Sequence, residues 1–122
     1  MRCGLKRQGL VKSQYTLDCL GIESWDEFKK YWKLKIDRWN EKHLDDVITE
    51  LTAEVDHIKP VSVFKQYVHG NANHYTNLQP LSSKVHSKKG NKWDVVDEHF
   101  WQKYIYKNPR AETYYPLEMK TV

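Results

Sequence analysis

The stretch Glu54-Val55-Asp56-His57-Ile58-Lys59-Pro60 sets the expectations for the fold. Its apolar residues are typical of a short buried strand, and Pro60 predicts the end of that strand because proline has no N–H to donate to a neighbour. Successive side chains of a strand point to opposite faces. Asp56 and His57 can therefore serve one site only where the regular pleat breaks, and we expect both at the rim of the sheet.

The segments that follow predict a strand-loop-strand-helix order. Residues 53–58 and 76–81 are the predicted strands, and glycine and asparagine between them indicate turns. Residues 82–89 are expected to form a helix with a serine cap and a closing glycine. Asn77 is expected inside the second strand and His86 on the helix.

Further helices are expected on both sides of this segment. A Ser-x-x-Glu capping box and aromatic residues at helical spacing predict a helix over residues 24–40. Residues 44–51 fit either helical turns or part of a strand. Asp94 is a candidate cap for a last helix, which stops before residue 109 because proline follows there. The expected apolar face of that helix is Val96, Phe100 and Tyr104.

Length and composition bound the class of protein. The chain has 122 residues, the size of one domain, and the pattern of elements indicates an α+β fold. The sequence has no apolar run of membrane-spanning length and no signal-peptide pattern, which predicts a soluble intracellular protein of the cytoplasm, nucleoid or nucleus. Cys3 and Cys19 are too far apart for a Cys-x-x-Cys zinc site, so neither structural zinc nor a disulfide is expected.

The charge is distributed unevenly. The formal net charge is +4, with a pI of about 9.0. Residues 57–93 contain lysine but no acid, and residues 1–14 are also basic, whereas residues 41–56 are mainly acidic. A long window of one sign indicates a polyanionic partner. The lysines expected to contact phosphate are Lys59, Lys84, Lys88, Lys89 and Lys92.

Three motifs in order carry a family resemblance. They are "VDHIKP" at 55–60, "HYTNLQPL" at 74–81 and "HSKKGNK" at 86–92. Together they resemble the HNH endonucleases, in particular small phage and viral proteins, whose ββα-metal core is a β-hairpin crossed by a helix. "LGIESWDEFKKYW" at 20–32 resembles the helix before that core. The resemblance implies a single nuclease domain over 1–122, with a basic arm (1–16), a helical region (18–52), the core (53–93), and a C-terminal helix and tail (94–122).

The chemistry of phosphodiester hydrolysis gives each motif residue a role. His57 is the expected general base, because a neutral imidazole is suited to take a proton from water near neutral pH. Asp56 and His86 are the expected metal ligands. Asn77 does not titrate, and the resemblance implies that its hydrogen bonds hold the hairpin and orient His57. His74 is a further candidate for substrate contact.

The expected function is hydrolysis of duplex DNA by a one-metal mechanism, with nicking and double-strand cleavage both open. One carboxylate and one imidazole with open positions suit Mg²⁺ or Mn²⁺, although the imidazole also admits Ni²⁺, Co²⁺ or Zn²⁺. Two alternatives remain at this level. One is a catalytically degenerate HNH module that binds DNA or is recruited by a partner, and the other is a metal-dependent ribonuclease.

Overall fold

The computed structural model describes residues 14–67 and 70–108, so residues 1–13 of the predicted basic arm, residues 68–69 and the predicted tail from residue 109 lie outside the described residues. The elements in order are α1 (Gln14–Leu20), α2 (Trp25–Lys42), β1 (Glu54–His57), the 3-10 helix η1 (Val61–Lys65), the 3-10 turn η2 (Tyr75–Asn77), β2 (Leu78–Leu81), α3 (Ser83–Lys89), α4 (Val95–Phe100) and the π-helix η3 (Trp101–Ile105). Helices and a small antiparallel sheet together confirm the α+β class. Helix α1 was not predicted.

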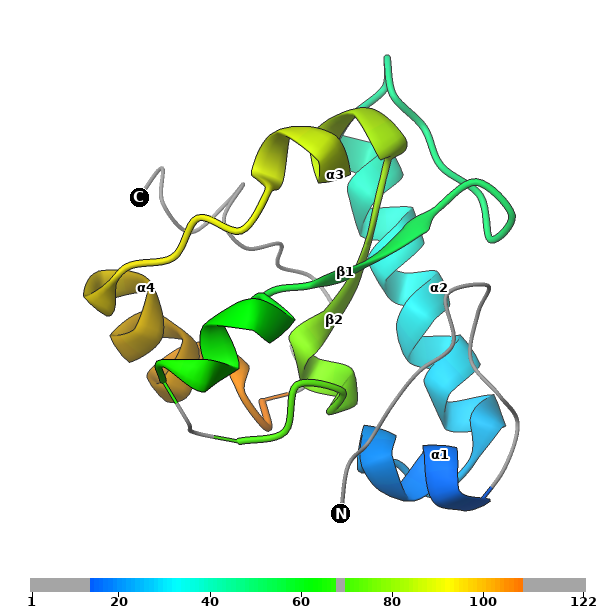
Figure 1. The fold of residues 1–122 in the computed structure, drawn as a ribbon. Coiled ribbons are helices and arrows are strands. Elements are labelled where there is room, and N and C mark those ends of the chain that lie inside the picture. Colours follow the sequence, from blue (N-terminus) through cyan, green and yellow to red (C-terminus); the bar gives the residue numbers. More distant parts are fainter. Residues whose placement is uncertain (1–13, 68–69, 109–122) are drawn as a thin grey trace.

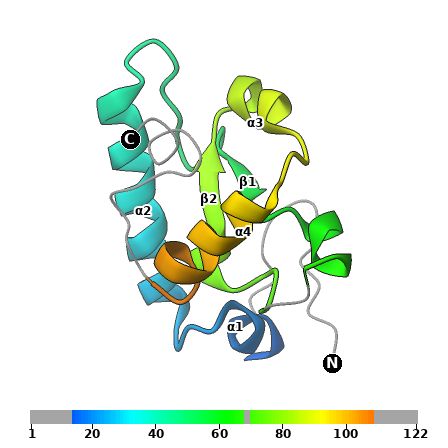
Figure 2. The ribbon, with the colours of Figure 1, turned by 90° about the vertical axis from the view of Figure 1, so that its left-hand side faces the viewer.

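A two-stranded hairpin lies at the centre of the molecule. β1 and β2 are antiparallel, with Asp56 opposite Gln79 and His57 opposite Leu78. The hairpin lies between α2 on one side and α4 with η3 on the other (Figures 1 and 2). Every residue of β2 is buried. Because an isolated hairpin of this length is marginal in water, these helices stabilise it.

Helix α2 forms as its sequence predicts and packs on β2. The hydroxyl of Ser24 accepts the backbone N–H of Glu27 at 3.2 Å, which caps the first turn. Further along the helix, Ile36 and Trp39 form a buried cluster with Leu81 at the end of β2. The aromatic stripe of α2 therefore belongs to the core.

The other side of the hairpin is covered by the C-terminal helices. Ile58, just after β1, packs with Trp101 and Ile105 of η3. Asp94 caps α4 as predicted and forms a reciprocal capping box with Asp97. The predicted apolar face is wrong for Val96, which is 70% exposed, and for Tyr104, which is 37% exposed, whereas Phe100 packs against the cluster of Ile58, Trp101 and Ile105. The acids Asp97 and Glu98 are buried instead, and they accept hydrogen bonds from the backbone N–H of Asp94 and from the indole of Trp93.

Two local predictions differ from the structure. Residues 43–53 form a loop without helix or strand, and the amide of Asn40 fixes this loop by exchanging two hydrogen bonds with the backbone of Ile48. The apolar side chain of Leu51 remains 97% exposed there. Asn77 lies in the turn η2 immediately before β2 rather than inside the strand.

Two general expectations have different outcomes. Cys19 is buried in α1 and is disulfide-bonded, with its partner outside the described residues, so the expectation of free thiols is wrong. Within residues 14–67 and 70–108, no helix is long and apolar enough to cross a membrane.

Candidate active site

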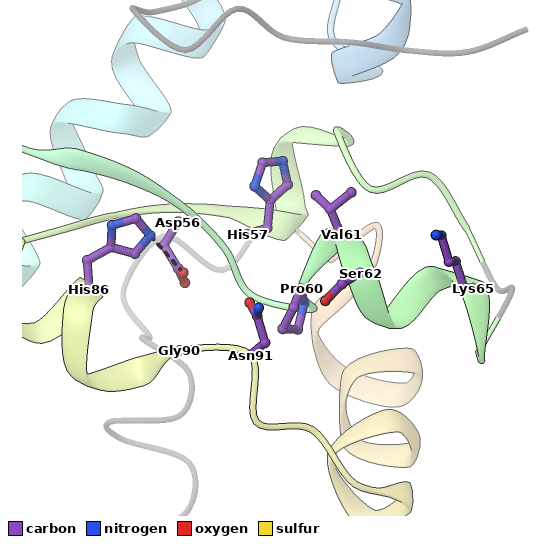
Figure 3. A pocket seen from close by; sticks show the side chains of 9 residues that line it. All are labelled: Asp56, His57, Pro60, Val61, Ser62, Lys65, His86, Gly90 and Asn91. Atoms are coloured by element: carbon purple, nitrogen blue, oxygen red, sulfur yellow. Dashed lines mark ion pairs between the residues drawn. The ribbon is translucent and has the colours of Figure 1, made fainter.

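A cleft of about 560 Å³ surrounds the end of β1. Strand β1, the turn into η1, and the C-terminal end of α3 supply its walls (Figure 3). α3 follows β2 directly and packs against β1. It ends at Gly90, whose φ of 57° lies in the left-handed region that favours glycine. The lining residues are Asp56, His57, Pro60, Val61, Ser62, Lys65, His86, Gly90 and Asn91.

Asp56 is the buried acid of this cleft, with 4% of its surface exposed. Its Oδ2 accepts a hydrogen bond from Gln79 Nε2 at 2.9 Å. Its Oδ1 lies 3.3 Å from the ammonium of Lys89 and 3.6 Å from Nε2 of His86. Burial raises the pKa of this carboxyl, and the charge and hydrogen bond of Lys89 and the hydrogen bond of Gln79 oppose that rise only in part.

His86 is oriented by a carboxylate that the sequence analysis did not single out. Nδ1 of His86 lies 2.6 Å from Oε1 of Glu54, and the hydrogen bond from His86 lowers the pKa of Glu54. An ionised carboxylate can only accept, so the shared proton is on Nδ1, and in the neutral imidazole Nε2 keeps its lone pair. That nitrogen is the one near Asp56. Glu54 precedes Asp56 by two residues on β1, and residues two apart in a strand lie on the same face. The sequence therefore contained the information that Glu54 lies beside Asp56.

His57 lies on the other side of the strand end. In Figure 3 its imidazole and the carboxylate of Asp56 leave β1 in opposite directions, as the pleat requires. The cleft touches both side chains because β1 ends at His57 and the chain turns away through Pro60. The expectation of a broken pleat is therefore replaced by a simpler arrangement, a cleft that wraps around the end of the strand.

The donors at this end of β1 fit a divalent cation. Asp56 Oδ1 and His86 Nε2 offer an oxygen and a nitrogen 3.6 Å apart. When two ligand atoms each lie about 2.1 Å from one ion and form a right angle at it, they are about 3.0 Å apart. A small side-chain rotation would therefore bring Asp56 Oδ1 and His86 Nε2 from 3.6 Å to the spacing that one ion requires. The described residues contain no cluster of three or more His, Cys, Asp and Glu side chains that could hold a metal. An ion held by this pair would take its remaining ligands from water and substrate.

The structure corrects the prediction that Lys59 contacts substrate. Its ammonium is fully buried, 2.9 Å from the carboxylate of Glu98, and donates to the backbone oxygen of Tyr67 at 2.6 Å. It also lies over the rings of Phe64 and Trp101 at 4.2 Å and 4.6 Å from their centroids. Lys59 therefore joins the end of β1 to α4 and does not reach a polyanion.

The remaining candidate lysines differ in position. Lys89 points inward, where Nζ donates to the backbone oxygens of His57 and Ile58 at 3.1 Å each and pairs with Asp56, so it supports the site from behind. Lys65, which was not among the candidates, lines the cleft on η1 and is exposed. The exposed lysines on or just after α3 that do not line the cleft are Lys84, Lys88 and Lys92.

Asn77 does not reach the cleft, because its side chain is fully buried. Its Oδ1 accepts from the N–H of Lys59 at 2.8 Å and from the indole of Trp101 at 2.9 Å. Its Nδ2 donates to the backbone oxygens of Ala72 at 2.8 Å and Lys59 at 3.3 Å. Both amide hydrogens and both lone pairs are thus used, and Asn77 ties the two ends of the hairpin loop to η3.

His74 also lies away from the cleft. Its Nδ1 accepts the N–H of Thr76 at 3.3 Å and contacts that residue's hydroxyl at 2.7 Å, which caps η2. Its ring lies so close to Gly21 that a Cβ there would be 2.6 Å from it. Burial and the charge of Lys107 lower the pKa of His74. These contacts give His74 a packing role in place of the predicted substrate contact.

No family model matches this chain, and no curated protein and no solved structure is similar to it. The HNH resemblance therefore depends on the three motifs and on the positions of their residues. Of the candidate site residues in these motifs, Asp56, His57 and His86 line one cleft, whereas Asn77 is fully buried and does not line it.

Proposed function

We propose that the protein is a metal-dependent endonuclease of the HNH type, built on a ββα-metal core of β1, β2 and α3, which hydrolyses phosphodiester bonds of duplex DNA. The observation that carries the proposal is that Asp56, His86 and His57 all line one open cleft around the end of β1, with Asp56 Oδ1 and His86 Nε2 3.6 Å apart. A carboxylate, an oriented imidazole and a separate imidazole base are the groups that this hydrolysis needs. Exposed lysines around α3 supply the positive surface.

His57 is the group that takes the proton from the attacking water. Its ring lines the cleft but is not tied to Asp56 or His86, so its proton chemistry is separate from the ligand pair. Asp56 and His86 would hold Mg²⁺ or Mn²⁺, which when bound supplies positive charge to the phosphate and to the leaving oxygen. Glu54 keeps the proton of His86 on the ring nitrogen that faces away from Asp56.

The cleft also offers two side chains for the substrate. Lys65 forms no ion pair or hydrogen bond within the described residues and lies at the end of the cleft away from the Asp56–His86 pair (Figure 3). Its ammonium would contact a phosphate that neighbours the scissile one, as a mobile point charge. Val61 is 54% exposed between the two ends and forms an apolar wall.

The test is incision of supercoiled plasmid in Mg²⁺ or Mn²⁺. We expect nicked or linear product from the wild type, none in excess chelator, and a loss of about 10²- to 10⁴-fold in rate for His57→Ala because the base is removed. His43→Ala is the matched control, since His43 stacks on Trp39 at the far end of α2 and lies outside the cleft. Binding without incision by the wild type would favour a degenerate DNA-binding module, and preferential cleavage of RNA would favour a ribonuclease.

A further inference from the structure

One polar contact of His57 is not explained by the roles assigned so far. Nε2 of His57 lies 2.9 Å from Oδ1 of Asn73, a residue 16 positions further along the chain. Asn73 is buried, with 6% of its surface exposed, and does not line the cleft. Asn73 therefore contacts the imidazole of His57 from the protein interior, outside the cleft in which substrate would bind.

The backbone that carries Asn73 is held from several directions. Asn71 Oδ1 accepts the N–H of Asn73 at 3.0 Å, and Asn71 Nδ2 donates to the backbone oxygen of Cys19 in α1 at 2.6 Å. The N–H of Asn71 donates to the hydroxyl of Tyr106 after η3 at 2.9 Å. On the next residue, Ala72, the carbonyl accepts from the buried amide of Asn77. The loop that carries Asn73 is thus tied through Asn71 to α1 and to Tyr106, the residue that follows η3.

We propose that Asn73 is a positioning residue that holds the imidazole of His57 in the tautomer with its proton on Nε2. An amide oxygen can only accept, so the 2.9 Å contact places the proton on Nε2 and leaves the lone pair on Nδ1 for the attacking water. This role rests on the proposed function of His57 as base. The hydrogen bonds of residues 71–73 hold Asn73 in place, so its contact fixes the direction of the His57 ring as well as the tautomer.

The side chain of Asn73 is suited to this role for a second reason. An amide has no charge, so it orients the imidazole without the added attraction for a protonated ring that a carboxylate has. By contrast, His86 is oriented by the carboxylate of Glu54. The two imidazoles of the cleft are thus held by different groups, which matches a ligand in one case and a proton acceptor in the other.

The tautomer is measurable without any activity assay. Long-range ¹H–¹⁵N NMR of the full chain, at alkaline pH and with His57 assigned by a His57→Gln variant, distinguishes Nε2–H from Nδ1–H. We expect the Nε2–H form in the wild type and in Asn73→Asp, and a mixture in Asn73→Leu, which lacks the acceptor. Asn40→Leu is the structural control, because it removes a partly buried amide that forms two hydrogen bonds with the backbone of Ile48, outside the cleft.

The kinetic arm uses the same variants on plasmid DNA. We expect Asn73→Leu to lower kcat by about 100-fold at nearly unchanged KM, since a misplaced base loses that order of rate, with substantial recovery in Asn73→Asp. An Nδ1–H tautomer in the wild type, or an unchanged tautomer and kcat in folded Asn73→Leu, would overturn the proposal. The expected tautomers in a wild type that incises no DNA would support positioning by Asn73 and overturn the nuclease function.

Discussion

The buried ammonium of Lys59 allows a sharp distinction between a structural and a substrate-binding lysine. In the variant Lys59→Met the charge is removed, while an apolar stem of similar length remains. The carboxylate of Glu98, which is 5% exposed, then loses its cation. Burial alone would raise the pKa of Glu98, but hydrogen bonds from Gln102, Lys59 and Trp93 outweigh that effect and lower it, so the carboxylate is ionised in the folded protein.

The expected loss follows from this arrangement. Breaking a buried ion pair from one side costs about 3–5 kcal/mol because a buried charge is left without its counter-ion. Glu98 keeps its hydrogen bonds from Trp93 and Gln102, which places the loss near the lower end, at about 3 kcal/mol. With an unfolding entropy of about 2.1 cal/mol/K per residue over the chain, this corresponds to a Tm lower by about 12 °C.

The assay is urea and thermal denaturation followed by tryptophan fluorescence. Lys65→Met is the matched control, since its side chain is exposed in the cleft and its removal leaves stability within about 0.5 kcal/mol. The double variant Lys59→Met with Glu98→Gln should regain part of the loss because the unpaired charge is gone. A Lys59→Met protein of wild-type stability that has lost its DNA affinity would refute the structural role and restore the substrate contact expected from sequence.

Three further predictions concern single side chains. Burial raises the pKa of Asp56 above 3.8, so ionisation of this carboxyl opposes folding. Asp56→Asn should abolish incision. The stability of Asp56→Asn in urea, relative to the wild type, should increase as pH rises from below 3.8. A stability difference between the two proteins that stays constant from pH 3 to pH 7 would contradict the raised pKa. The pKa of His74 is lowered below 6.5, so wild-type stability should fall as pH drops below 6.5. His74→Gln should make stability depend less on pH in this range. An equal pH dependence in both proteins would contradict the lowered pKa of His74. Lys65→Ala should reduce the slope of log binding constant against log salt concentration by about 0.9. Lys33→Ala removes an exposed lysine that is paired with Asp37 on α2 and should leave this slope unchanged. Equal slopes for the two variants would argue against a phosphate contact of Lys65.

Local signals in the sequence predict the hairpin and the helices that start with a cap. Ser24 and Asp94 cap α2 and α4 through contacts three residues away, and Gly90 ends α3 at a positive φ. Such interactions lie within one turn, so the order of residues alone reveals them. Glu54 was within reach of the same kind of reasoning, because it shares a strand face with Asp56.

Long-range contacts explain the predictions that failed. Lys59 lies in a lysine-rich window, but its partner Glu98 is 39 residues away and on a different element. The loop at 43–53 contains apolar residues at helical spacing, yet it is held by Asn40 and by the indole of Trp39, which donates to the backbone oxygen of Asp46 at 2.7 Å. Neither partnership leaves a periodic pattern in the sequence, so only the folded structure shows which side chains are withdrawn from the surface.

The claim that most directly underlies the proposed chemistry is that Asp56 and His86 hold one divalent cation at the end of β1. Titration of the full chain with Mn²⁺, followed by paramagnetic broadening of assigned NMR signals, locates such an ion without an activity assay. We predict that broadening starts at His57, His86 and Asn91, spares His43, and is lost in Asp56→Asn. Broadening centred elsewhere, or the same broadening in Asp56→Asn, would contradict a metal site at this cleft.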